Sequence, residues 1–124
     1  MSIAASRSLQ RASDNQIYGW SGSQALTNSG TTLLDYYNPA GYYLTRITIA
    51  FDYSAMNVND VLSYIVQVDG ANLFVWKATM TEFVLGHQPQ QLEVVIGPNS
   101  KVLITSAQDQ NRGTAACVLT GFKV

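Results

Sequence analysis

The chain has 124 residues and a net charge of −1; 47% of the residues are hydrophobic and only 12% are charged. This length suits a single domain with a sizeable core, and the charged fraction is about half of the usual share in soluble domains. The near-neutral balance without a basic patch argues against a nucleic-acid partner, and no apolar run approaches the roughly 18 residues needed to cross a membrane.

The first 15 residues differ in pattern from the rest of the chain. They show no sustained hydrophobic period and contain few large apolar side chains. We predict a flexible or extended N-terminal arm over residues 1–15 and a single domain over residues 16–124. Arg7 and Arg11 precede the first acidic residue, Asp14, which makes the arm mildly basic. The arm lacks the apolar segment of a signal peptide, so we expect synthesis in a cytoplasm.

The pattern becomes β-like from residue 16 onward. QIYGWSG and QALTN are short candidate strands, and TTLLDYY (31–37) is a stronger one that ends at the turn Asn38-Pro39-Ala40-Gly41. YLTRITIAFDY (43–53) is the longest clear strand, and its alternation predicts one buried face. That face contains Tyr43, Thr45, Ile47, Ile49 and Phe51.

The middle of the chain predicts a β-hairpin. LSYIVQVD (62–69) repeats the alternation, and Asp69-Gly70 is a strong two-residue turn signal before NLFVWKA (72–78). We interpret TEFVL (81–85) as another short strand and GHQPQ (86–90) as a loop.

The stretch EVVIGPNSKVLITSA (93–107) contains two apolar runs around Gly97-Pro98-Asn99-Ser100. Proline cannot donate a backbone hydrogen bond, so Pro98 marks a chain reversal between two strands. The loop QDQNRG (108–113) then precedes a final strand, TAACVLTGFKV (114–124), in which Cys117 is expected to lie in the core.

About eight or nine strands at intervals of roughly ten residues, without a helix-period segment of useful length, predict an all-β fold. We expect a two-sheet antiparallel β-sandwich, and a jelly roll is the topology that fits this number of strands. An immunoglobulin-like sandwich is the alternative, although the chain lacks the Cys–Trp–Cys pattern of that fold.

The residues that usually carry catalysis are scarce. His87 and Cys117 are the only histidine and the only cysteine, too few for a zinc site. Glu82 and Glu93 are the only glutamates and lie on separate predicted strands, so a carboxylate pair is not indicated. No nucleophile elbow or phosphate-binding loop occurs. We therefore predict a protein that is not an enzyme, with no catalytic residue, no metal and no cofactor.

Aromatic residues concentrate in the first half of the chain. Three interpretations remain open for them: core packing, a subunit interface, or a platform on which sugar rings stack. The low charge favours protein–protein contact, because charge keeps proteins apart and interfaces are rich in Tyr and Trp. A monomer with a neutral, polar exterior would have the same composition. The candidate interface residues are Arg7, Arg11, Tyr18, Trp20, Tyr36 and Tyr42.

The order of segments provides a further indication. A polar arm is followed by TTLLDYYNPAGYYLTRITIAF, the hairpin VDGANLFVW, then VVIGPNSKVLITSA and the closing TAACVLTGFKV. Over residues 31–124 this pattern resembles small single-jelly-roll accessory proteins of virions, particularly the capsid cement or decoration proteins of tailed phages. The resemblance carries over no functional residue.

The resemblance implies a structural protein of the virion, a cement, decoration or vertex-associated protein made in the host cytoplasm. Its partners would be the major capsid protein or other virion proteins, and it would form a homo-oligomer, typically a trimer, that stabilises the shell. The N-terminal arm would reach a neighbouring subunit and order there.

Two other functions compete with this one. The first is a carbohydrate- or receptor-binding β-sandwich module, such as a fibre tip or a lectin-like domain, which predicts an exposed ring at Trp20 or Trp76 and a glycan partner. The second is a small β-sandwich enzyme or cupin-like protein, which would need clustered His and Glu residues that the chain lacks.

Overall fold

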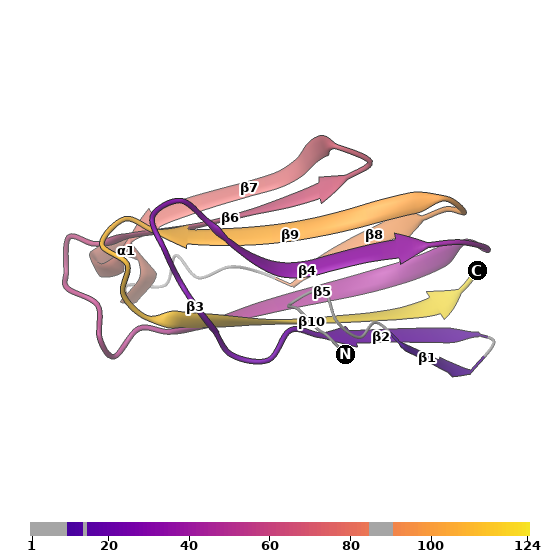
Figure 1. Cartoon of the computed structure of the whole chain (residues 1–124), viewed down its shortest axis with the longest axis horizontal. Helices are drawn as coiled ribbons and strands as arrows, with labels where there is room; N and C mark the ends of the chain where they lie inside the picture. Colours follow the sequence, from indigo (N-terminus) through magenta and orange to yellow (C-terminus); the bar gives the residue numbers. More distant parts are fainter. Residues whose placement is uncertain (1–9, 14, 85–90) are drawn as a thin grey trace.

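The computed structural model describes residues 10–13, 15–84 and 91–124. These residues form two antiparallel sheets that pack face to face, so the predicted two-sheet antiparallel β-sandwich is confirmed (Figure 1). The β4–β5 and β8–β9 connections and the C-terminus lie at one end of the sandwich, and the short helix α1 (Met80–Val84) lies at the other.

One sheet has six strands among the described residues. Its order is β1-β2-β10-β5-β8, and β3 also pairs with β10. The bounds of these strands are β1 Gln10–Ser13, β2 Gln16–Trp20, β3 Gln24–Ala25, β5 Tyr43–Asp52, β8 Leu92–Ile96 and β10 Thr114–Lys123. Apart from β1 and β2, the neighbours in this order are distant in the sequence. The long pairing of β5 with β10 joins the middle of the chain to its C-terminus.

The other sheet has four strands in the order β4-β9-β6-β7. Their bounds are β4 Thr31–Asn38, β6 Val61–Val68, β7 Ala71–Thr79 and β9 Ser100–Gln108. Among β4 to β10, β6 and β7 are the one pair of consecutive strands that are hydrogen-bonded to each other. The other consecutive strands in this range lie in different sheets.

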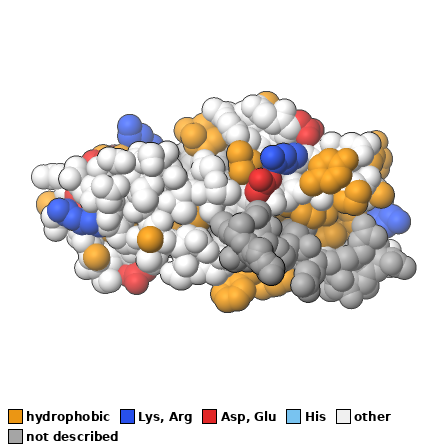
Figure 2. All heavy atoms as spheres, in the orientation of Figure 1, with side chains coloured by type: hydrophobic (Ala, Val, Ile, Leu, Met, Phe, Trp, Pro, Cys, Tyr) orange, Lys and Arg blue, Asp and Glu red, His pale blue; other side chains and the backbone are white. Residues whose placement is uncertain are grey.

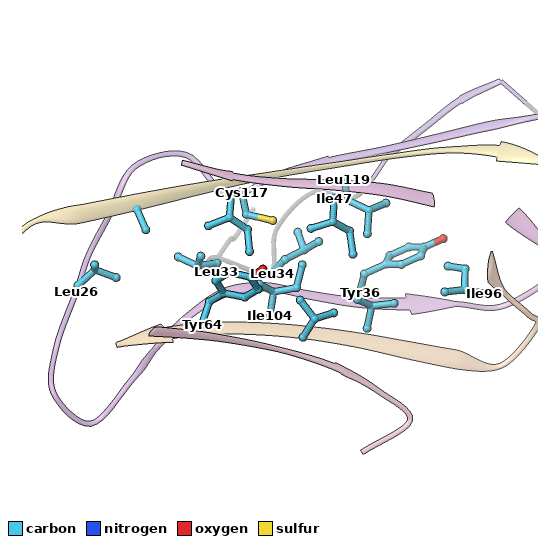
Figure 3. Packing of buried hydrophobic residues seen from close by; sticks show 14 of the residues in the cluster. Leu26, Leu33, Leu34, Tyr36, Ile47, Tyr64, Ile96, Ile104, Cys117 and Leu119 are labelled. Atoms are coloured by element: carbon cyan, nitrogen blue, oxygen red, sulfur yellow. The ribbon is translucent and has the colours of Figure 1, made fainter. Parts of the chain in front are cut away.

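The core lies between the two sheets and comes from the alternation of each strand. Ile47, Cys117 and Leu119 of the six-stranded sheet point toward residues of the four-stranded sheet that include Leu34, Tyr64 and Ile104 (Figure 3). Cys117 is fully buried, as predicted. The predicted inward face of β5 is also confirmed, because Tyr43, Thr45, Ile47 and Ile49 are buried and Phe51 is half-buried.

Two turns have the conformations that their sequences favour. Asp69 and Gly70 have φ angles of 53° and 85°, and positive values at both central residues are typical of the type I′ turn. This confirms the hairpin between β6 and β7. In the β8–β9 connection, Pro98 is followed by Asn99 with φ 61°, which suits a type II turn and confirms the predicted reversal.

Asn38 connects two turns at one end of the sandwich. Its buried side-chain amide donates hydrogen bonds to the carbonyl oxygens of Gly41 at 2.9 Å and Gly97 at 2.8 Å. The first carbonyl belongs to the β4–β5 turn and the second to the β8–β9 turn. The backbone N–H of Asn99 in turn donates to the carbonyl oxygen of Asn38 at 2.7 Å. One side chain therefore holds together segments that are 59 residues apart.

The prediction of a strand over TEFVL (81–85) is wrong, because residues 80–84 form α1. Thr79 and Glu82 explain the difference. The backbone N–H of Glu82 donates to Thr79 Oγ1 at 3.2 Å, and the backbone N–H of Thr79 donates to Glu82 Oε1 at 2.9 Å. This reciprocal pair is a capping box, which satisfies N–H groups at a helix start and so favours a helical turn.

Part of the predicted N-terminal arm is a strand. Residues 10–13 form β1, which pairs antiparallel with β2, and residues 1–9 lie outside the described residues. The loop predicted over residues 86–90, with His87, also lies outside them. No helix in the described part of the chain is long and apolar enough to cross a membrane.

Candidate functional site

The outward side chains of β2, β10, β5 and β8 line up in rows across the six-stranded sheet. We call this surface the outer face of the six-stranded sheet. The strand registers give two rows of four side chains, one row of three and one row of two, and Gln91, which precedes β8, extends the row of three through its hydrogen bond to Thr48. The rows are Gln16–Phe122–Leu44–Val95, then Tyr18–Thr120–Arg46–Glu93, then Trp20–Val118–Thr48–Gln91, and finally Ala116–Ala50.

Large apolar side chains are exposed on this face. Trp20 is 54% exposed and Phe122 is 60% exposed, and Leu44 and Val95 beside Phe122 are also exposed. Phe122, Leu44 and Val95 are cross-strand neighbours on three adjacent strands, so they form one continuous apolar strip. Groups of exposed apolar side chains on a protein surface are typical of contacts with other molecules.

The charges on this face neutralise each other. Arg46 Nη2 and Nε donate hydrogen bonds to Glu93 Oε2 at 2.8 and 3.1 Å. The amide of Gln91 donates to the hydroxyl of Thr48 at 3.1 Å. A shallow depression of about 80 Å³ lies beside the ion pair, lined by Leu44, Thr45, Arg46, Glu93, Thr120 and Phe122. The face is therefore neutral, with an apolar strip and with hydrogen-bonding groups that are paired with each other at its centre.

Charged side chains are sparse elsewhere too. Figure 2 shows one side of the molecule, on which blue and red side chains are few and scattered among white and orange ones. Two further ion pairs occur among the described residues, Lys101 with Asp35 at 3.4 Å and Arg112 with Asp60 at 3.2 Å. Both are formed within this chain, so these two basic and two acidic side chains are already paired.

The candidate interface residues separate into different environments. Tyr18 and Trp20 lie on the outer face of the six-stranded sheet. Tyr42 is exposed beside this face, next to the β8–β9 turn, where its ring packs over Gly97. Tyr36 lies in the core at 9% exposure, and the neighbouring Tyr37 is exposed instead.

The basic candidates belong to the N-terminal segment. Arg7 lies outside the described residues, and Arg11 lies in β1 at the edge of the six-stranded sheet. The structure therefore brings together the two aromatic residues of β2, with Tyr42 nearby.

The sequence did not single out the residues that complete this face. Phe122, Leu44, Val95 and Val118 alternate with core residues in their strands, so their exposure follows from period two. Trp76 was a candidate for an exposed ring, but it packs against the core. Its ring stacks between Phe51, at 5.8 Å between centroids, and Tyr64, at 5.5 Å.

A cavity lies at the opposite end of the sandwich, near α1. It has a volume of about 450 Å³, and its lining is mostly apolar: Tyr53, Ser54, Met56, Asn57, Val58, Met80 and Thr81. Among the described residues, no three His, Cys, Asp or Glu side chains gather in a group that could hold a metal ion. Burial raises the pKa of the Cys117 thiol to about 12, which keeps it protonated and unreactive.

Asp60 ties together the loops near this cavity. Its carboxylate accepts a hydrogen bond from the backbone N–H of Asn57 at 3.0 Å and pairs with Arg112. The N–H of Asn57 holds the pKa of this carboxyl below its usual value against the opposing effect of burial, and Gln108 and Arg112 lower it further. The carboxylate has enough local partners to explain its burial as a structural role.

A scan against protein-family models and a search of curated proteins find no match to this chain.

Proposed function

We propose that the protein is a structural component of a virion, of the capsid cement, decoration or vertex-associated type, and that it acts by binding other proteins. The observation that carries this proposal is the outer face of the six-stranded sheet, which has exposed large apolar side chains and an ion pair that leaves it neutral. A surface of this kind gains free energy when a partner covers it, because apolar area is removed from water without unpairing charges.

The strand order supports the jelly-roll topology that such proteins have. From β4 onward, every consecutive pair except β6 and β7 changes sheet. An immunoglobulin-like sandwich would keep more consecutive strands together, as with its A–B and D–E pairs in one sheet and F–G in the other. Each sheet contributes four strands to this arrangement, in the orders β2-β10-β5-β8 and β4-β9-β6-β7. The total of eight is the number that a jelly roll needs.

The partners would be the major capsid protein, other virion proteins or further copies of this chain, and neither a cofactor nor a nucleic acid is part of the proposal. Mass spectrometry of particles purified from the source of the gene tests it. We expect the chain in the particles at a copy number comparable with that of a shell subunit. Absence from intact, washed particles would overturn the proposal, because a cement protein remains bound to its shell.

A carbohydrate- or receptor-binding module is the second candidate function, and one observation favours it. Tyr18 and Trp20 are two residues apart on β2, so both rings lie exposed on the same face and could stack on sugar rings. In a Trp76→Phe background, Trp20 is the sole tryptophan. Saturable quenching of its fluorescence across a glycan panel would support this function, and no response to any glycan would argue against it.

A further inference from the structure

Four strands of the six-stranded sheet, β2, β10, β5 and β8, have a nearly symmetric outline about the boundary between β5 and β10, whereas β1 and β3 lie on the β10 side only. The central strands β5 and β10 have 10 residues each, and the flanking β2 and β8 have 5 residues each. β2 pairs with residues 118–122 of β10, and β8 pairs with residues 43–47 of β5, which lie at nearly the same level of the sheet. A half-turn about an axis along the strands at this boundary therefore superposes the outline on itself.

Several side chains at the centre of the rows also match when each row is reversed. In the row Gln16–Phe122–Leu44–Val95, the half-turn places the ring of Phe122 over Leu44 of a second copy. In the short row it places Ala116 over Ala50, and both side chains are small enough to allow close approach. Apolar groups therefore meet apolar groups at the centre of the first row and in the short row. Gln16 faces Val95, and in the row Trp20–Val118–Thr48–Gln91 the half-turn places Trp20 over Gln91 and Val118 over Thr48.

The polar row is complementary to its own reverse as well. Its order is Tyr18–Thr120–Arg46–Glu93. The half-turn places the phenol of Tyr18, a hydrogen-bond donor, over the carboxylate of Glu93, and the hydroxyl of Thr120 over the guanidinium of Arg46. Each Arg46–Glu93 pair stays intact within its own chain, so no unpaired charge is buried.

We propose that this face binds the same face of a second copy of the chain, about a two-fold axis that runs along the strands between β5 and β10. Such an interface is isologous, so each contact occurs twice and the surface must be self-complementary. The pairs Phe122/Leu44, Tyr18/Glu93, Thr120/Arg46 and Ala116/Ala50 meet this requirement. This two-fold pairing rests on the proposed function, in which the same face contacts another protein. It identifies that protein as a second copy of the chain. It differs from the trimer that the resemblance to cement proteins implies.

The size of the face sets the expected strength. Strands about 4.8 Å apart with a rise of about 3.3 Å per residue give the four strands roughly 500 Å² in projection. Specific interfaces begin near about 600 Å² of accessible surface per partner, so the face is slightly below that range. We therefore expect a reversible dimer that dissociates at micromolar concentrations and is favoured where many copies are held close together.

Sedimentation equilibrium of the full chain from about 1 to about 500 μM tests the proposal. We expect a monomer–dimer equilibrium. Leu44→Lys, which places a charge opposite Phe122 of the second copy, weakens dimerisation at least tenfold. Val75→Lys is the matched control, because Val75 is exposed on the four-stranded sheet, and it leaves the equilibrium unchanged. A chain that stays monomeric, forms a trimer, or is affected equally by both variants overturns the two-fold pairing. Circular dichroism checks that each variant is folded.

Positions 18 and 93 provide a test of the register. They lie on β2 and β8, three strand spacings apart, or about 14 Å within one copy, so these side chains meet only across the proposed interface. Tyr18→Glu and Glu93→Lys each weaken the dimer, and the double variant restores it because the exchanged charges attract. A double variant no stronger than the weaker single variant overturns this register.

The test of the two-fold pairing and the test of the virion function can fail independently. A wild-type chain that remains monomeric but is found in particles overturns the two-fold pairing alone. A dimeric chain that is absent from particles overturns the virion function and leaves the pairing standing.

Discussion

Replacing Asn38 by Asp tests how strongly one buried amide holds the end of the sandwich. The substitution keeps the shape of the side chain but removes both N–H donors to the carbonyl oxygens of Gly41 and Gly97. A buried polar group that loses its partner costs about 1–3 kcal/mol, so two carbonyls together cost about 3 kcal/mol or more. Stabilities of domains this size are about 5–15 kcal/mol, so the loss is a large fraction of the total.

The cost depends on pH in a defined direction. The introduced carboxyl is surrounded by carbonyl oxygens and shielded from water, which raises its pKa in the folded state above the unfolded value. A raised folded pKa means that the folded variant binds the proton more tightly. Its stability relative to wild type is therefore highest below about pH 4 and falls as the pH rises through the folded pKa.

Urea denaturation followed by circular dichroism at pH 4 and pH 7 measures both effects. Asn72→Asp is the matched control, because Asn72 is exposed and uses its Oδ1 to accept a hydrogen bond from Gln67, which a carboxylate retains. We expect the control to change the free energy of unfolding by less than about 0.5 kcal/mol. If Asn38→Asp costs no more than the control at pH 7, the bridging role assigned to Asn38 is wrong.

Three further substitutions test the packing, the helix start and the buried ion pair. A Cβ on Gly121 would lie 2.8 Å from Ile17 Cγ1 and 3.2 Å from Thr45 Cγ2. Gly121→Ala should therefore lower the free energy of unfolding by about 1–3 kcal/mol through overpacking. A thermal melt that shows no loss of stability would contradict this. Thr79→Ala should cost about 1 kcal/mol by removing the cap of α1, whereas Thr79→Ser keeps the hydroxyl and should cost much less in the same urea assay. The folded pKa of Asp60 is lowered from 3.8, so its stabilising effect is present above that value and is lost as the pH falls through the folded pKa. Asp60→Asn should therefore be less stable than wild type at pH 7. Below about pH 4 its melting temperature should fall less steeply with pH than that of wild type. Equal slopes for the two proteins would show that Asp60 does not contribute to acid unfolding.

Most of the fold could be predicted because alternation with period two is a strong signal wherever one face of a strand is buried. The strands β5, β6, β9 and β10 show it clearly, and the turn residues between strands added their own preferences. The helix α1 could not be found by period, since five residues make little more than one turn. The sequence Thr79-Met80-Thr81-Glu82 did contain the capping-box signal, which outweighs the β-like composition of the residues that follow.

Which aromatic side chains face outward was harder to predict. In β4 a register shift between Thr32 and Leu34 buries both Leu33 and Leu34, and this irregularity decides that Tyr36 faces the core while Tyr37 is exposed. A one-residue shift moves every later side chain to the other face, and composition does not reveal it. In β7 both alternating sets contain large apolar residues, so the sequence left the position of Trp76 open until its stacking partners were known.

The pairing of charges within the chain limits how this protein can recognise a partner. Arg46, Lys101 and Arg112 each pair with an acid of the same molecule, and the net charge is −1. Long-range attraction that accelerates association needs an excess of one charge on each partner, and this surface does not offer it. Under the proposed function, selectivity would then come from the shape of the apolar strip around Phe122 and from the hydrogen-bonding groups beside it. Binding of this kind varies little with salt, and its lifetime depends on how well the partner fits the strip.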